Sequence, residues 1–371
     1  MLPFVDHVYA NSGLYTARVT IIDTARGQGT VTLPVTVNNI APTISGTAPP
    51  VSVANHPAAF NFSITDVSPG DTAAGFGLSI LWGDGSPTEY VQTPVFGSYA
   101  GTHRFTTPGT FTVRGTANDD VHSSVWTQSV TVNQYGMVGS DLVVNGTTGN
   151  DVLNFTATSN AAVVNATLNG VSLGNFTLPT VNGVVGTVFA YGRAGNDTIE
   201  AKSALIGSTT YQFPRAVAFH GGDGNDTLTM SATALVTSAL VGGAGNDTLT
   251  GGGGMDILVG GLGVDSLTGG NNNDILIGNK VAYEDDLLAM RMLRLEWGQN
   301  ISPQAKIDHL RGVMAGGLNG GYYLTAATIT EDNAIDDLWG NAGQDWFLSP
   351  ISGSFIDRRR DYAGGDFYTN L

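Results

Sequence analysis

The sequence contains no cysteine among its 371 residues. A disulfide framework, a zinc–thiolate site and a cysteine nucleophile are therefore excluded. Its apolar runs stay shorter than the roughly 18 residues that a membrane-spanning helix needs, so we expect no membrane span. If such a protein works outside the cell, something other than disulfide bonds must stabilise it.

Charged residues are scarce as well. They make up 12% of the chain, about half of the usual fraction of roughly 25%. The 15 basic residues, only three of them lysines, face 31 acidic residues, which gives a formal net charge of −16. Because the basic stripe that neutralises phosphates is missing, we expect no nucleic-acid partner. Cations or a neutral surface are better candidates.

Signs of catalysis are few. The H-E-x-x-H string of metalloproteases is absent, and the six histidines are scattered, with no pair at the spacing of a helical metal site. We likewise expect no G-x-S-x-G string, which marks the nucleophile elbow of lipases. The sequence therefore predicts that this chain is not an enzyme. One alternative stays open: the chain is the noncatalytic C-terminal portion of a larger secreted hydrolase and serves in export and stabilisation.

A first internal repeat spans residues 7–39 and recurs at residues 103–134, about 95 residues later. Each copy alternates apolar residues of β type after a glycine turn, which predicts paired antiparallel strands with one buried face. We expect Trp82 and His103 in the core or in strand pairing. Asp84, in a D-G turn, is expected to bond its own backbone.

The segments LWGDGS at 81–86 and HRFTTPGTFTVRGTANDD at 103–120 resemble the PKD (polycystic kidney disease-type) domain, an immunoglobulin-like β-sandwich. The resemblance implies one complete sandwich over residues 42–135 and the C-terminal half of another over residues 1–40, so that the natural chain would extend upstream. We interpret these domains as spacers. The resemblance also allows them to bind glycan or protein surface ligands.

A second repeat is sharper. Four consecutive nonapeptides begin at residues 242, 251, 260 and 269 and follow the pattern G-G-x-G-x-D-x-U-x, except that Asn272 replaces the third glycine. Glycine permits a positive φ and close backbone approach, so six residues can form a tight turn. The other three form a short strand with its apolar residue, U, pointing inward. Two nonapeptides then make one coil of a parallel β-roll, whose strands lie about 4.8 Å apart.

Further copies of this repeat begin at residues 146, 192, 221 and 340. The pattern resembles the calcium-binding repeats of RTX (repeats-in-toxin, hemolysin-type) proteins. The resemblance implies Ca²⁺ as the cofactor, an extracellular or cell-surface location, and export by type I secretion.

The stacked aspartates give a physical reason for a cation. Two carboxylates about 5 Å apart repel by about 3 kcal/mol at an effective dielectric constant of roughly 20. Calcium takes about 6–8 oxygen ligands and can bridge carboxylates and carbonyls of adjacent coils, whereas magnesium keeps its waters. The alternation predicts one row of metal sites along Asp226, Asp247 and Asp265 and another along Asp256 and Asp274. The glycines expected to shape these sites are Gly222, Gly224, Gly243, Gly245, Gly252, Gly254, Gly261, Gly263 and Gly270. The isolated copies supply a secondary set of candidates, namely Asp151, Asp197 and Asp345.

Together these features predict a mainly β protein, with an immunoglobulin-like sandwich followed by a parallel β-roll that carries a short helical insertion. We predict that it binds calcium ions and is a secreted or cell-surface structural or adhesive protein whose roll folds on binding extracellular calcium. After the sandwich we expect irregular β coils over 138–220, the RTX roll over 221–280, a helical insertion over 281–330 with helices at 282–296 and 302–311, and a roll-like cap with a C-terminal tail over 331–371.

Overall fold

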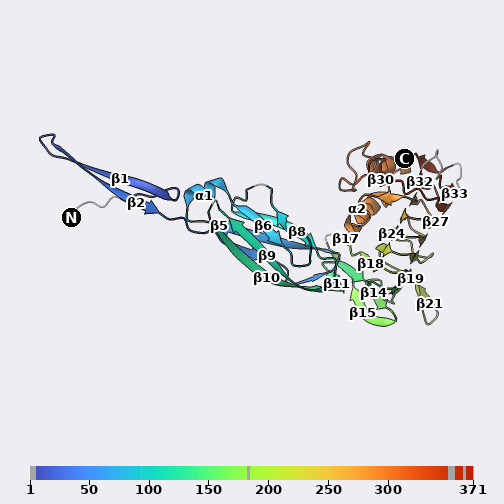
Figure 1. The fold of residues 1–371 in the computed structure, drawn as a ribbon. Helices are drawn as coiled ribbons and strands as arrows, with labels where there is room; N and C mark the ends of the chain where they lie inside the picture. Colours follow the sequence, from blue (N-terminus) through green and yellow to red (C-terminus); the bar gives the residue numbers. More distant parts are fainter. Residues whose placement is uncertain are drawn as a thin grey trace. The chain divides into compact units, whose positions relative to one another are not determined.

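The chain forms two compact units, residues 1–133 and 134–371, which are treated separately below (Figure 1). The structure is a computed structural model. It describes residues 6–92, 94–119, 121–181, 184–349, 356–361 and 365–370.

Alternating apolar residues build a β-sandwich in the first unit. In β5 (Pro57–Thr65), Ala58, Phe60, Phe62 and Ile64 are buried and the residues between them are mostly exposed, as expected for a strand with one face on the core. Two facing sheets close over this core. Their strand orders are β3 (Thr43–Thr47), β5, β8 (Ser98–Arg104) and β4 (Val51–Val53), β10 (Ser123–Asn133), β9 (Gly109–Asn118), β6 (Gly77–Leu81), β7 (Glu89–Tyr90).

The region upstream of the sandwich is a hairpin. β1 (Gly13–Ile22) and β2 (Gln28–Val37) pair antiparallel along their full lengths. Within the described residues these two strands pair only with each other. Residues 1–40 were expected to be the C-terminal half of a sandwich, and residues 13–37 within them form a β-hairpin. A short helix, α1 (Pro69–Ala74), follows β5 in the sandwich and is capped by the side chain of Ser68.

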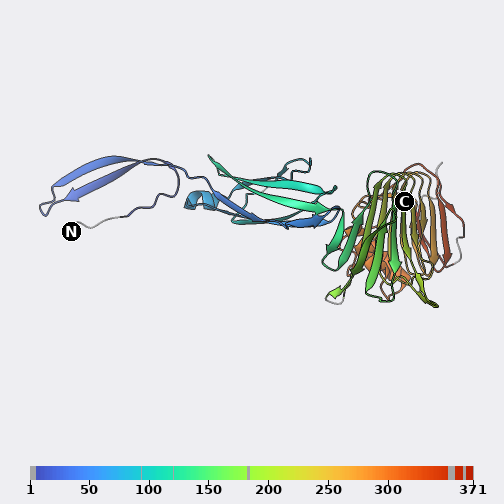
Figure 2. The ribbon, with the colours of Figure 1, turned by 90° about the horizontal axis from the view of Figure 1, so that it is seen from below.

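The second unit is a β-roll, mostly parallel, in which the strands alternate between two sheets from residue 188 onward (Figure 2). We call one the covered sheet, because helices pack on its outer face, and the other the solvent-facing sheet. Among the described residues each sheet contains nine strands. The covered sheet has the order β11 (Tyr135–Val138), β12 (Asp141–Asn145), β18 (Val188–Ala194), β22 (Val217–Asp223), β24 (Ser238–Ala244), β26 (Ile257–Leu262), β28 (Ile275–Ile277), β32 (Trp346–Leu348), β34 (Phe367–Thr369). The solvent-facing sheet has the order β15 (Val171–Thr177), β14 (Val163–Leu168), β13 (Val152–Ala157), β19 (Thr198–Lys202), β23 (Thr227–Met230), β25 (Thr248–Thr250), β27 (Ser266–Asn271), β31 (Asp337–Ala342), β33 (Arg358–Arg359).

The roll is longer than the sequence predicted. Residues 138–220 were expected to form irregular coils, yet β12 pairs in parallel with β18, and β13 with β19. The inward ladder of Leu153, Ile199 and Leu228 is already regular there. The extra residues leave the ladder as small hairpins: β16 (Thr180–Val181) with β17 (Val184–Val185), and β20 (Ala204–Ile206) with β21 (Thr209–Tyr211). The C-terminal end also differs, because β33 and β34 continue both sheets beyond Trp346 and Phe347.

The helical insertion explains why the two sheets differ in burial. In β24 of the covered sheet six successive residues are buried, whereas β19 of the other sheet alternates between buried and partly exposed residues. The helix α2 (Leu287–Trp297) packs against β22 and β24 and covers that face. It begins later than predicted, because Asp286 is its cap and accepts a hydrogen bond from the Leu288 N–H. The second helix, α3 (Pro303–Leu310), is capped by Ser302 as expected.

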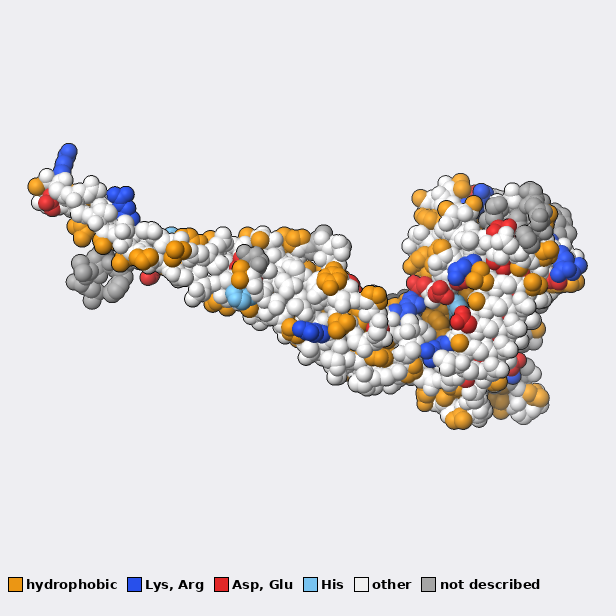
Figure 3. Space-filling model, viewed as in Figure 1, with side chains coloured by type: hydrophobic (Ala, Val, Ile, Leu, Met, Phe, Trp, Pro, Cys, Tyr) orange, Lys and Arg blue, Asp and Glu red, His pale blue; other side chains and the backbone are white. Residues whose placement is uncertain are grey.

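The mainly β fold class is confirmed, with its sandwich, its roll and its helical insertion. No helix in the described part of the chain is both long and apolar enough to cross a membrane. The visible face in Figure 3 is largely uncharged, in keeping with the small charged fraction of 12%.

Candidate metal centre

The first predicted row of aspartates forms a hydrogen-bonded ladder across the coils. The backbone N–H of Asp226 donates to Oδ1 of Asp247 at 2.7 Å, and the N–H of Asp247 donates to Oδ1 of Asp265 at 2.8 Å. The ladder reaches further toward the N-terminus than the tandem repeats, because Asp151 donates to Asp197 at 2.7 Å and Asp197 to Asp226 at 2.6 Å. The structure therefore places two of the secondary candidates in the same row.

The second predicted row lies on the other edge of the roll and is built in the same way. The N–H of Asp256 donates to Oδ1 of Asp274 at 2.8 Å, and that of Asp274 donates to Oδ1 of Asp345 at 2.8 Å. This row begins at Ser238, whose N–H and hydroxyl both donate to Oδ1 of Asp256. Asp345, the third secondary candidate, is thus part of it.

Sequence reasoning missed three members of these rows. Asp336 accepts from the Asp265 N–H at 2.7 Å and in turn donates its own N–H to Asp357 at 3.1 Å. Asp366 accepts from the Asp345 N–H at 3.0 Å. A signal was present: Asp336 precedes Asp345 by nine residues, and Asp357 precedes Asp366 by the same interval.

The other carboxylate oxygen, Oδ2, distinguishes most of these aspartates from ordinary buried polar groups. Asp256 and Asp151 are exceptions, because their Oδ2 atoms accept from the N–H groups of Gly252 and Thr147. Leaving a buried acceptor unpaired costs about 1–3 kcal/mol. Burial first, and then neighbouring carboxylates, raises the pKa of Asp226 to about 7, of Asp265 to about 8 and of Asp274 to about 10. Within the described residues, Oδ2 is buried and has no hydrogen-bond partner in Asp197, Asp226, Asp247, Asp265, Asp274, Asp336 and Asp357.

The first glycine of each repeat leaves room for this oxygen. A Cβ built on Gly242 would come well within 3.0 Å of both Oδ2 of Asp247 and the carbonyl oxygen of Gly260 in the next coil. Gly260 stands in the same relation to Oδ2 of Asp265 and to the carbonyl oxygen of Gly278. In each of these coils, a carboxylate oxygen and a carbonyl oxygen therefore lie next to the first glycine of the repeat. Any larger residue at that position would collide with them.

The second and fourth glycines of the repeats serve the turn itself. Gly243 and Gly245 have φ values of +117° and +135°, which side chains with a Cβ rarely adopt. Asn272, which replaces a glycine, has φ of +68°, and asparagine tolerates that region. The predicted glycines that share a positive φ are Gly222, Gly224, Gly261, Gly263 and Gly270.

Glycines in these turns were expected to permit a positive φ, but neither Gly252 nor Gly254 has one. A Cβ on Gly254 would instead collide with the carbonyl oxygen of Val236, because the longer half-coil over residues 230–241 passes close to this turn. At Gly254, glycine is therefore required because a Cβ would not fit, and not because φ is positive.

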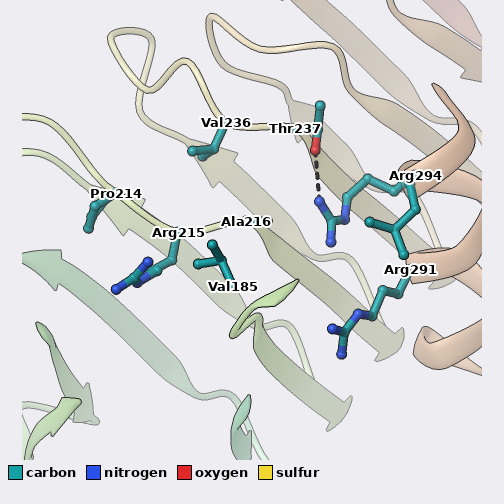
Figure 4. A pocket seen from close by; sticks show the side chains of 9 residues that line it. Val185, Pro214, Arg215, Ala216, Val236, Thr237, Arg291 and Arg294 are labelled. Atoms are coloured by element: carbon teal, nitrogen blue, oxygen red, sulfur yellow. Dashed lines mark hydrogen bonds between the residues drawn. The ribbon is translucent and has the colours of Figure 1, made fainter. Parts of the chain in front are cut away.

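The covered sheet and α2 enclose a pocket of about 440 Å³ that contains three arginines (Figure 4). Arg294 donates to Thr237 Oγ1 at 2.7 Å, and Arg291 forms an ion pair with Asp141 at 2.7 Å. Arg215 turns away from both (Figure 4), so the guanidinium groups do not converge on one point. Burial raises the pKa of Asp256 to about 6, although the nearby Arg294 charge works in the opposite direction. The insertion thus places a cation near the second row.

One G-x-S-x-G string does occur, at residues 170–174, contrary to expectation. The structure places it at the tight antiparallel turn between β14 and β15, with Ser172 exposed and opposite Thr167. A nucleophile elbow needs a strand-to-helix turn, and this segment is a hairpin. The string therefore does not have the geometry of a nucleophile elbow.

In the sandwich, the residues singled out from the sequence form a structural cluster. Trp82 is buried, and the ring of His103 stacks on it with centroids 4.3 Å apart. Nε2 of His103 lies 2.7 Å from Oδ2 of Asp84, while Oδ1 of Asp84 accepts from the N–H and the hydroxyl of Ser86. Burial raises the pKa of Asp84, but the hydrogen bonds from Ser86 and His103 outweigh it and hold that pKa below its usual value.

The donor set of the roll is made of carboxylate and carbonyl oxygens, which are the ligands that calcium prefers. These features define a calcium-binding β-roll. The model of the RTX calcium-binding nonapeptide repeat matches the chain in four copies, over residues 219–229, 239–267 and 250–280. The chain therefore carries RTX calcium-binding repeats, and Ca²⁺ is their cofactor.

Comparison with solved structures finds a PKD domain that matches part of this chain. The PKD domain of an M14-like peptidase from a Thermoplasmatales archaeon is 28% identical, covering 26% of this chain and 98% of that one, with a TM-score of 0.23. The likeness of the sandwich to a PKD domain rests on its motif and its own strands. Among curated proteins, no sequence matches this chain.

Proposed function

We propose that calcium binding folds and stabilises the roll, and that the chain is a structural or adhesive component outside the cell or on its surface. The observation that carries this proposal is the row of buried Oδ2 atoms that have no partner within the described residues. Without a cation, these carboxylates must either be protonated or repel one another across the coils. A calcium ion between coils removes both costs.

Asp226, Asp247 and Asp265 would hold calcium along the first edge, and Asp256 and Asp274 along the second. Backbone carbonyls of the first glycines supply further oxygens. The chemistry that calcium contributes is neutralisation of charge and coordination of several oxygens at once. The chain's own residues fix the spacing, because each Oδ1 is already held by the neighbouring coil.

Mass action gives the scale of the effect. A ligand that binds only the folded state stabilises it by about 1.4 kcal/mol per site when its free concentration is about ten times Kd. Extracellular modules bind calcium with Kd values of roughly 10⁻⁴–10⁻³ M. Several sites together would therefore make a roll that is loose in a calcium-poor cytosol and folded outside, which suits export by type I secretion. Calcium replaces the disulfides that the chain lacks.

The sandwich would act as a spacer that holds the roll away from its attachment point. Its aromatic cluster is buried and internally paired, which supports a structural role for these residues. Binding of a glycan or protein surface would use its exposed strands.

Calcium titration of the full chain tests this proposal. Far-UV circular dichroism should show a cooperative gain of β signal with Ca²⁺ and little change with Mg²⁺. An Asp247→Asn variant should need more calcium for the same change. Asp223→Asn is the matched control, because Asp223 lies in the same repeat as Asp226 but is exposed. A roll that is fully folded in chelator and indifferent to calcium would refute the proposal.

A further inference from the structure

The pocket between the covered sheet and α2 has a charge opposite to that of the whole chain. Its volume of about 440 Å³ falls within the roughly 300–1,000 Å³ that is usual for small-molecule sites. Three of the 12 arginines of the chain line it, and no described acidic residue does. In a chain with a formal net charge of −16, such a lining favours an anionic ligand.

Arg294 contributes a buried positive charge that only neutral groups contact. It is 5% exposed, and its guanidinium donates to Oγ1 of Thr237 at 2.7 Å and to Oγ1 of Thr187 at 3.4 Å. Its Nε has no hydrogen-bond partner, and no carboxylate among the described residues forms an ion pair with it. Burial first, and then the neighbouring charge of Arg291, lowers the pKa of Arg294 to about 10.

Arg215 repeats this situation on the opposite side of the pocket (Figure 4). It is 9% exposed, and its guanidinium donates to the carbonyl oxygen of Leu178 at 3.0 Å. Its Nε is buried without a partner, and in the described part of the chain no carboxylate pairs with it. Burial lowers the pKa of Arg215, so the folded protein holds this charge at a cost.

The third arginine is already neutralised. Arg291 forms an ion pair with Asp141 at 2.7 Å. A buried charge is costly unless it is paired and hydrogen-bonded. Arg215 and Arg294 are therefore the two cations of the pocket that an added anion would stabilise.

The wall that carries Arg291 and Arg294 is fixed in place. Trp297 of α2 is fully buried, and its Nε1 donates to the carbonyl oxygen of Asn273 at 2.7 Å. The insertion that contains α2 is closed at its base by the short pair β29 (Lys280–Val281) and β30 (Ile329–Thr330). The pocket is thus formed before any ligand arrives, which lowers the entropic cost of binding.

The shape of the charged lining limits the class of ligand. Because Arg215 lies across the pocket from Arg294 (Figure 4), one small anion cannot pair with both. The remaining lining includes the apolar residues Val185, Ala216 and Val236, which suit a hydrocarbon segment. A guanidinium fork matches the two oxygens of a carboxylate.

We propose that this pocket binds a small organic dianion, whose two carboxylates pair with Arg215 at one end and Arg294 at the other while an apolar chain lies between them. This inference goes beyond the proposed function, because it concerns a second ligand and a different face of the roll. The site depends on the helical insertion, since α2 supplies Arg294. The nonapeptide repeats alone would therefore not bind this ligand.

Isothermal titration calorimetry of the full chain in saturating calcium tests this proposal. The probes are succinate, adipate, suberate and sebacate, which differ only in the length of the chain between the carboxylates. We expect an affinity optimum at one chain length. The fatty acid with the same number of carbons should bind about tenfold more weakly or worse, because it can pair with one arginine only.

Variants separate binding from structure. Arg215→Gln should bind the dicarboxylate about tenfold more weakly or worse, and no better than the matching fatty acid. Arg294→Lys keeps the charge but loses the fork and should also bind more weakly. Arg311→Gln is the matched control, because Arg311 is exposed at the C-terminus of α3. Circular dichroism in calcium shows whether each variant is folded.

Three results would overturn the proposal: no binding of any of the four dicarboxylates at millimolar concentration, equal affinity for a dicarboxylate and its matching fatty acid, or equal affinity of the wild type and folded Arg215→Gln. If Arg215→Gln does not fold, Arg294→Lys and the comparison of probes decide. None of these results bears on the calcium-dependent folding of the roll, which the calcium titration tests separately.

Discussion

The polar cluster around Asp84 in the sandwich and the aspartate rows of the roll differ in how their carboxylate oxygens are paired. In the sandwich, the partly buried Asp84 has partners for both carboxylate oxygens, from Ser86 and from His103. In the roll, Asp247 and Asp265 have a partner for Oδ1 but none for Oδ2 among the described residues. Asp84 is therefore fully paired within the protein, although Oδ2 of Asp66 and of Asp71, also in the sandwich, has no partner among the described residues. For the aspartates of the roll, the proposed function supplies a cation as the missing partner.

This contrast shows how one chain without cysteine can contain two kinds of stability. An apolar core with paired polar groups is stable wherever the chain is, because it needs no ligand. Under the proposed function, the stacked carboxylates of the roll are stable only where calcium is present. The proposal therefore predicts that the calcium concentration controls the stability of the roll and not that of the sandwich.

The substitution with the largest expected effect lowers the stability of the sandwich and leaves the stability of the roll unchanged. Phe60 is fully buried and packs against Trp82 and Phe105. Phe60→Ala should lower the free energy of unfolding of the sandwich by about 3–5 kcal/mol through the lost transfer energy and the cavity. Hydrogen exchange during urea unfolding would measure it in peptides from β5. Any change in the calcium midpoint of the roll would argue against independent units.

A slightly smaller effect should weaken the roll alone. Asp265→Ala leaves the buried N–H of Asp247 without its acceptor and removes a proposed ligand, so we expect a loss of about 3 kcal/mol in saturating calcium. Thermal melting in calcium would report it. Asp223→Asn should behave like the wild type. If Asp265→Ala melts like the wild type both in calcium and in chelator, the row has no role in stability.

A third substitution tests the space around the oxygens. Gly242→Ala places a Cβ against Oδ2 of Asp247 and the Gly260 carbonyl, and we expect a loss of about 2 kcal/mol and weaker calcium binding. Gly29→Ala, in the hairpin, is the matched control, because nothing lies within 4 Å of a Cβ there. Isothermal titration calorimetry would compare their calcium affinities. Equal affinities would show that the first glycine does not shape the site.

The smallest effect concerns the sandwich and pH. Because the folded-state pKa of Asp84 lies below its usual value, its contribution to stability is present above about pH 4 and lost as the pH falls further. Asp84→Asn should lower sandwich stability at neutral pH by about 1–2 kcal/mol and flatten its decline in acid. Urea unfolding between neutral and acidic pH would measure this. If the stability of the wild type and that of Asp84→Asn decline in parallel as the pH falls, other groups cause the acid sensitivity.

The sequence predicted those parts of the roll in which spacing is regular. Asp247 and Asp265 are 18 residues apart, one full coil, so their common row follows from counting. Asp151 and Asp197 are 46 residues apart and Asp197 and Asp226 are 29 apart. The extra residues form hairpins outside the ladder. The 18-residue period is therefore not visible in the sequence, although the hydrogen-bonded ladder of aspartates is continuous in the structure. The RTX repeats and their cofactor are confirmed, while the individual ligands stay predictions.

Two other features depended on contacts that no local pattern records. The sequence did not predict that Gly278 lies against Oδ2 of Asp336 in one turn, because a helical module separates the two residues in sequence. The need for glycine at Gly254 comes from the carbonyl of Val236, which only the folded path of the chain brings near. Local spacing predicts a turn, but it does not predict which distant backbone crosses it.

Hydrogen exchange of the full chain, with and without calcium, tests the central claim most directly because it reports on both units in one sample. We expect peptides from β5 and β9 of the sandwich to be equally protected in calcium and in chelator. Peptides from β23 to β28 should be protected in calcium, and in chelator they should exchange at close to the unfolded rate. Equal protection of the roll in both conditions would contradict the claim that it is built around calcium.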